Sequence, residues 1–160
     1  MTDNYIQIMI ESLEKKAAKL DEIIEKNEEQ AELLKEEEFS VELFDRNVAE
    51  KAVLIQQLEM LDIGFDRMYE RVKEELASEA GKVTFQNEIK KMQALISRLT
   101  EKSVSIQAQE SRNKQMVETI FKSEREKIRA VKLGSKAAID YYKNMNHTNF
   151  VSPQFVDKKN

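Results

Sequence analysis

Apolar residues recur at alternating steps of four and three along three long stretches of this chain. Steps of this size place one apolar seam along an α-helix, and such a seam packs lengthwise against another helix. The first seam contains one polar member, Asn27. The apolar members are Ile6, Ile10, Leu13, Ala17, Leu20, Ile24, Ala31 and Leu34 in the first seam, Val41, Phe44, Val48, Ala52, Ile55, Leu58, Leu61, Phe65, Tyr69, Val72 and Leu76 in the second, and Phe85, Ile89, Met92, Ile96, Leu99, Ile106, Val117, Ile120, Ile128 and Val131 in the third. The repeats predict three long helices that pack side by side.

Turn-forming residues are scarce, because the 160 residues include only 3 Gly and 1 Pro. Many short strands cannot be connected without such residues, so the composition disfavours β and α/β folds. We expect an all-α fold, an elongated antiparallel helical bundle or coiled coil of three long helices with a flexible C-terminal tail. The expected helices span about 3–35, 40–78 and 84–133 within a bundle of residues 1–135. Residues 136–160 are expected to form a short helix and a flexible partner-binding tail.

The first two seams differ in register. The first seam, extended past Val41, reaches Asp45, whereas the apolar residue is Phe44. A slip of one residue turns the apolar stripe by about 100°, so one straight helix cannot bury both seams. Acidic residues at 36–38 suit the first turn of a helix better than the last. We therefore expect a kink or short turn between Lys35 and Ser40, with a continuous bent helix as the alternative.

Residue types suggest where the helices begin and end. Thr2 or Asp3 can cap the first helix. Gly81 can end the second helix in a left-handed conformation, and Thr84 can then cap the third.

The third seam turns polar between Ser103 and Asn113, where Gln107, Gln109, Glu110 and Arg112 also occur. Buried polar residues in coiled coils commonly fix the register of the helices. We expect a register-setting polar layer here, with a groove edge or a bend as the alternative.

Charge is distributed unevenly along the chain. Residues 1–80 hold 22 Asp and Glu against 10 Lys and Arg, a net charge of −12, whereas residues 81–160 hold 8 against 16, a net of +8. Opposite signs suggest antiparallel docking of one half on the other; solvated helix faces are the alternative. The basic half has no dense Lys and Arg stripe, which disfavours nucleic-acid binding.

Residues for catalysis or metal binding are few. His147 is the only histidine, and cysteine is absent. Phosphate-binding loops, dinucleotide fingerprints and nucleophile elbows are also missing. We therefore expect no enzyme activity, no metal and no cofactor. No apolar run reaches the roughly 20 residues of a membrane span, and the first residues do not have the form of a signal peptide. A cytoplasmic location without membrane insertion is expected.

The C-terminal segment is rich in aromatic and apolar side chains, although flexible tails are usually poor in them. Such a tail either folds back on its own bundle or binds another protein, and we favour the second interpretation. The candidate partner-binding residues are Val117, Ile120, Phe121, Ile128, Val131, Ile139, Tyr141, Tyr142, Met145, Phe150 and Phe155.

Four stretches occur in an order that resembles the FlgN family of flagellar export chaperones, with its relative FliT as a close second. IESLEKKAAKLDEIIEKNEEQAELLKEEEFS is similar to the opening helix of the family and its acidic turn. VELFDRNVAEKAVLIQQLEMLDIGFDRM resembles the second helix, with Glu50, Lys51 and Arg67 in family-like places. AQESRNKQMVETIF places Asn113 ahead of apolar residues, as the family does, and YYKNMNHTNFVSPQFVDKKN resembles its Tyr-containing, basic-ended tails.

This resemblance implies a cytoplasmic chaperone that binds the amphipathic C-terminal helices of the hook-associated proteins FlgK and FlgL. It would prevent their premature assembly and deliver them to the flagellar type III export gate and its ATPase complex. In the family the C-terminal part binds cargo, and a tail tyrosine docks at the gate; Tyr141 and Tyr142 both match that place. The alternative is a structural coiled-coil or scaffold protein that forms a homodimer. For the chaperone we expect a monomer or a weak homodimer.

Overall fold

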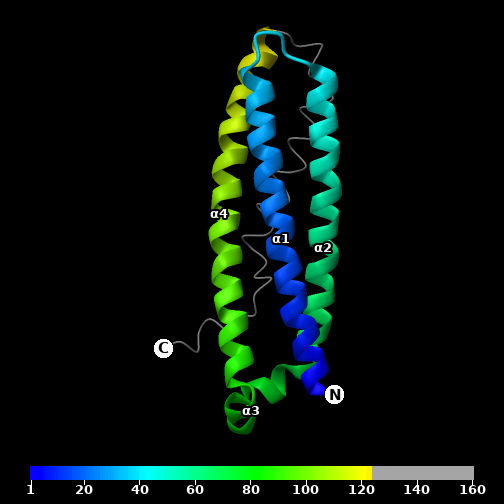
Figure 1. Ribbon diagram of the computed structural model, residues 1–160, viewed down its shortest axis with the longest axis vertical. Coiled ribbons are helices and arrows are strands. Elements are labelled where there is room, and N and C mark those ends of the chain that lie inside the picture. The colour runs from blue at the N-terminus through cyan, green and yellow to red at the C-terminus, as the bar shows by residue number, and fades with distance from the viewer. Residues whose placement is uncertain (124–160) are drawn as a thin grey trace.

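The computed structural model describes residues 1–123, which form four helices and, within that range, no strand (Figure 1). The helices are α1 (Thr2–Lys35), α2 (Val41–Ala77), α3 (Glu79–Thr84) and α4 (Gln86–Ser123). The predicted all-α bundle of three long helices is confirmed. The predicted continuation of the third helix to 133 and the predicted tail of residues 136–160 lie outside the described residues.

The helix α1 lies centrally in the rod. It packs lengthwise against both α2 and α4, whereas α2 and α4 make little close backbone contact with each other. α2 runs antiparallel to α1, and α4 runs parallel to it (Figure 1). The acidic α1 does meet the basic α4, and Lys91 Nζ lies 3.8 Å from Glu14 Oε2 across this interface. The predicted antiparallel docking is therefore wrong in direction for this helix pair.

The predicted seams form most of the core. One large cluster extends from Ile6 near the start of α1 to Ile106 in α4. Because α1 packs against two helices, it also buries Met9 and Ile23, which lie beside its predicted seam. In α2 the residue Ala52 is exposed, and its neighbour Lys51 is buried instead. A strict seven-residue step from Phe44 leads to position 51, so the geometry of the seam places the lysine inside.

Residues 36–40 form a non-helical connection between α1 and α2, at the place where the change of register predicts an interruption of the helix. Ser40 caps α2, because its Oγ accepts a hydrogen bond of 3.2 Å from the backbone N–H of Leu43. The alternative of a continuous bent helix is wrong.

The other expected caps are wrong. Met1 precedes α1 without a side-chain cap, and Thr2 lies inside the helix, where its Oγ1 donates to Glu75 Oε1 at 2.7 Å. Ser78 both ends α2 and caps α3, since its Oγ accepts from the N–H of Gly81 at 3.0 Å. Gly81 has no positive φ. Thr84 ends α3 instead of capping α4.

Close packing, rather than a left-handed backbone, requires the glycine at position 81. A Cβ atom built there would lie 1.8 Å from the backbone oxygen of Glu75. Gly64 differs, because a Cβ atom at that position of α2 would meet nothing within 4 Å.

The same substitution should therefore have opposite effects at the two positions. We expect Gly81→Ala to lower the free energy of unfolding by about 1–3 kcal/mol, because the turn must shift to admit the methyl group. Gly64→Ala should raise it by about 0.5–1 kcal/mol, because alanine favours the interior of a helix. Urea unfolding followed by circular dichroism measures both values. Equal effects at the two sites would contradict the described packing of α3 on α2.

Candidate partner-binding site

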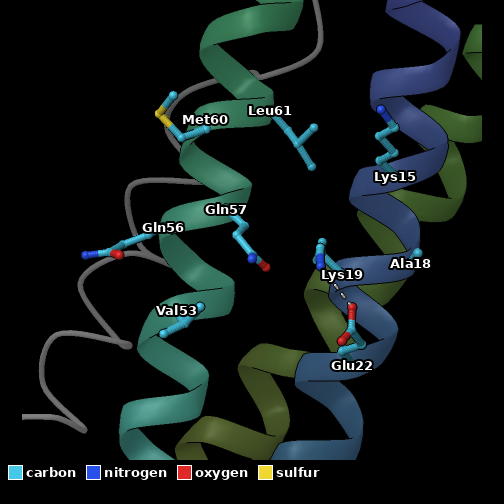
Figure 2. A pocket seen from close by; sticks show the side chains of 9 residues that line it. All are labelled: Lys15, Ala18, Lys19, Glu22, Val53, Gln56, Gln57, Met60 and Leu61. Atoms are coloured by element: carbon cyan, nitrogen blue, oxygen red, sulfur yellow. Dashed lines mark ion pairs between the residues drawn. The ribbon is translucent and has the colours of Figure 1, made fainter.

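An open groove of about 810 Å³ runs along the outer face of the α1–α2 pair (Figure 2). We call it the α1–α2 groove. Its lining is mostly apolar surface with lysines on the α1 side. The lining residues are Lys15, Ala18, Lys19 and Glu22 of α1 and Val53, Gln56, Gln57, Met60 and Leu61 of α2.

Figure 2 shows how side chains from the two helices approach each other across this groove. Gln57 and Leu61 extend toward α1, and the Lys19–Glu22 ion pair, at 3.4 Å, lies opposite them. Ala18 contributes only a methyl group to the lining, which is too small to cover the groove. Val53 and Met60 remain 53% and 68% exposed.

A second groove, of about 560 Å³, lies between α1 and α4 toward the end of α1. Its α1 side is acidic, with Glu25, Glu28, Glu29 and Glu32, whereas Arg112 is the basic side chain that α4 contributes. This groove is smaller and more polar than the α1–α2 groove.

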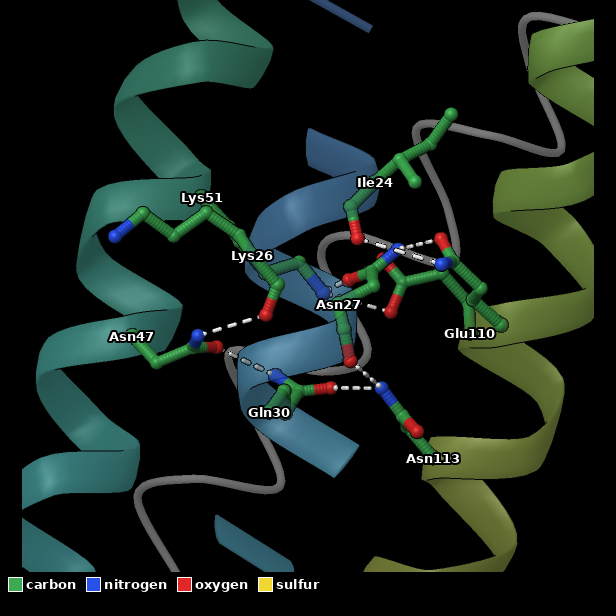
Figure 3. A network of polar contacts seen from close by, with 9 residues as sticks. Ile24, Lys26, Asn27, Gln30, Asn47, Lys51, Glu110 and Asn113 are labelled. Carbon is green, nitrogen blue, oxygen red and sulfur yellow. Dashed lines mark hydrogen bonds and ion pairs between the residues drawn. The ribbon is translucent and has the colours of Figure 1, made fainter. Parts of the chain in front are cut away.

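Below these surfaces a layer of buried amides joins the three long helices (Figure 3). Gln30 of α1 donates from Nε2 to Asn47 Oδ1 of α2 at 3.0 Å. Asn113 of α4 donates from Nδ2 to Gln30 Oε1, also at 3.0 Å. Asn113 and Asn47 further donate to the backbone oxygens of Asn27 and Lys26. The predicted polar layer near Ser103–Asn113 is confirmed, and it includes Asn27 of the first seam.

An ion pair belongs to the same layer. Lys51 Nζ of α2 donates to both carboxylate oxygens of Glu110 of α4, at 2.7 and 2.8 Å. The two side chains are 3% and 7% exposed. Burial lowers the pKa of Lys51, and its attraction to Glu110 offsets only part of this effect. For buried ion pairs in general, the cost of removing both charges from water can equal or exceed the gain from their attraction.

The Lys51–Glu110 pair should thus matter more for selecting one alignment of the helices than for the net free energy of unfolding. We expect Lys51→Met alone to lower the free energy of unfolding by about 3–5 kcal/mol, because it leaves Glu110 buried and unpaired. The double variant Lys51→Met with Glu110→Met should be neutral or more stable than the parent protein.

A double-mutant cycle in urea measures both effects. The exposed pair of Lys114 and Glu118, 4.0 Å apart on α4, provides the control, and its removal should cost about 0.5 kcal/mol or less. A double variant of Lys51 and Glu110 as unstable as the single variant would contradict the expectation.

A second cluster of charged residues lies nearer the start of α1 than the polar layer does. There Lys16 of α1 pairs with Asp62 of α2. Burial lowers the pKa of Lys16 and raises the pKa of Asp62, in each case more than the partner opposes it. Asp66, one turn along α2, also has a raised pKa, through burial first and the charge of Asp62 second. The carboxylate of Glu70 adds to this effect.

A carboxyl group with a raised pKa binds its proton more readily in the folded state, so its ionised form costs stability above that pKa. We expect Asp66→Asn to be more stable than the parent protein near neutral pH. This advantage should shrink as the pH falls from the raised pKa toward 3.8, the ordinary value of an aspartate, and should be absent below it, where the group is protonated in both states. Urea unfolding at a series of pH values measures the difference. An advantage independent of pH, or a loss at neutral pH, would contradict the direction of the shift.

A small apolar cluster lies beyond the polar layer, at the end of the rod that carries the α1–α2 loop. Leu34, Phe44 and Val117 are buried there, and Phe39 packs on Phe44 with ring centroids 5.5 Å apart. Val117 is a predicted partner-binding residue, yet only 4% of it is exposed, so its side chain is not an exposed contact. Ile120 packs partly buried against the same cluster.

The other candidate residues from the sequence lie at the end of α4 or outside the described residues. Phe121 falls within the last turns of α4. Ile128, Val131, Ile139, Tyr141, Tyr142, Met145, Phe150 and Phe155, and also His147, lie outside the described residues. The α1–α2 groove was not predicted; the one sequence signal for it is the seven-residue spacing of Val53 and Met60, on a face of α2 outside the seam.

The described residues offer surfaces for binding but no arrangement for metal chemistry. Between residues 1 and 123 no three His, Cys, Asp or Glu side chains gather as a metal-binding group. None of the four helices has the length and apolar character to cross a membrane. No family model, curated protein or solved structure matches this chain.

Proposed function

We propose that this protein is a cytoplasmic chaperone of flagellar type III export that holds amphipathic helices of its cargo. The observation that carries the proposal is a rod whose three helices satisfy their main seams within one chain while an apolar groove stays open along the α1–α2 face. A groove between two helices is a common site for the apolar face of a third.

The identity of the cargo comes from the resemblance to the FlgN family. The C-terminal helices of FlgK and FlgL are amphipathic and are destined for a multi-chain assembly. A chaperone that covers their apolar faces prevents premature association until export. The aromatic tail residues, with Tyr141 or Tyr142 at the export gate, remain the predicted second contact.

Burial of the seams favours this proposal over the scaffold alternative. A coiled-coil homodimer needs apolar seams that are free to meet a second chain. Here the described residues of all three seams, which end at Ile120 in the third, are largely buried, for example Leu13 of α1, Phe65 of α2 and Leu99 of α4. The proposal therefore includes a monomer or weak dimer as the resting state.

The test is to mix the full chain with FlgK or FlgL and to measure complex formation by sedimentation. We expect one chain per cargo molecule, with the self-assembly of the cargo suppressed. Cargo that lacks its C-terminal helices is the control and should neither bind nor change its assembly. Absence of any complex, or a tight homodimer that ignores the cargo, would refute the proposal.

A further inference from the structure

The α1–α2 groove has an apolar stripe that the seams do not explain. The seam of α2 is buried at Ile55 and Leu58, which belong to the large core cluster. Val53 and Met60 lie on another face, seven residues apart, and both are more than half exposed. Residues at this spacing share one side of a helix. The stripe therefore borders the groove for two helical turns. A helix that docked in the groove could cover it.

A glycine continues the same face. Gly64 is one turn beyond Met60 and lies near the middle of α2, a 37-residue helix. Glycine inside a helix costs about 0.5–1 kcal/mol relative to alanine. At Gly81 a steric contact requires glycine, but at Gly64 nothing described lies within 4 Å of a built Cβ atom. The open space at position 64 leaves room for close approach by another chain.

The charges around the groove are unusual for this half of the molecule. Residues 1–80 carry a net charge of −12, with only ten basic residues. Lys15 and Lys19 line the groove, and Glu22 is the single acidic residue among its described lining residues. Arg67 follows Gly64 by three residues on the same face of α2. Arg71 lies one turn further and reaches Tyr5 of α1, to which its Nη1 donates at 3.1 Å. Two lysines on the α1 side thus border an apolar strip in an acidic region, and Lys19 also pairs with Glu22.

From these features we propose that the α1–α2 groove binds an amphipathic helix of a partner protein whose apolar face is bordered by Asp and Glu. The apolar residues of that helix cover Val53 and Met60, and its acidic border meets Lys15 and Lys19. This inference rests on the helix-holding part of the proposed function and not on the flagellar identity of the cargo.

The experiment uses two fluorescent helical peptides of about three heptads with the same apolar seam. One peptide has Glu beside the seam, and the other has Lys in the same positions. The full-length chain should bind the Glu-bordered peptide more tightly. Val53→Asp and Met60→Asp should each weaken this binding about tenfold or more, equivalent to ~1.4 kcal/mol.

Matched control variants separate the groove from general surface effects. Val104 of α4 is 60% exposed, so Val104→Asp introduces the same charge away from the groove and should leave binding unchanged. Gly64→Leu should weaken binding, whereas Ala108→Leu, at an exposed position of α4, should not. Reversal of charge by Lys15→Glu with Lys19→Glu should shift the preference toward the Lys-bordered peptide. Circular dichroism and thermal melts confirm that each variant keeps the fold.

Several results would overturn the proposal. One is that Val53→Asp and Met60→Asp bind the Glu-bordered peptide as tightly as the parent protein does. Another is that Val104→Asp loses as much affinity for this peptide as they do. A third is that the parent protein does not prefer the Glu-bordered peptide over the Lys-bordered one. Self-association that Met60→Asp abolishes and the peptide does not displace would identify a second copy as the occupant instead.

The two proposals fail separately. FlgK or FlgL that binds Met60→Asp as tightly as the parent protein would refute the groove and leave the chaperone function standing. Groove-dependent binding of the acidic peptide without binding of either hook-associated protein would retain the groove and refute the flagellar function.

Discussion

We infer that the buried polar layer is the constraint that sets how the three long helices align. Apolar seams by themselves tolerate a slide of one heptad, because each leucine or isoleucine then meets another. Such a slide would place Lys51, Glu110 and Asn113 against apolar neighbours without their partners, at a cost of several kcal/mol. If the layer selects the alignment in this way, it also determines which surface residues of α1 and α2 meet at the α1–α2 groove.

Local patterns in the sequence predicted the helices and the break between α1 and α2, because periodicity and a change of register are visible within short windows. Features that depend on distant partners were missed. Lys51 looks like a surface residue until Glu110, 59 positions away, is placed beside it. Gly81 fits the usual pattern of a helix end, yet the hydroxyl of Ser78 and the oxygen of Glu75 determine its role.

The candidate site shows the same limit. An amphipathic pattern identifies an apolar stripe but does not say whether the protein's own helices cover it. Val117 belongs to such a stripe and is covered, since Leu34 and Phe44 meet it at the end of the rod. Val53 and Met60 lie outside the predicted seam and are more than half exposed. Only the antiparallel pairing of α1 with α2 brings Lys15 and Ala18 beside them.

The polar layer also divides the interior into two parts of unequal size. Among the described residues, nineteen are buried in the large cluster and three in the small one beyond the layer. Free energies of local opening generally follow the amount of buried apolar contact. The rod should consequently fray from the pole of the α1–α2 loop, where amide protons exchange first. The opposite end of the rod would then stay folded, so the end with the α1–α2 loop can open locally without unfolding of the whole bundle.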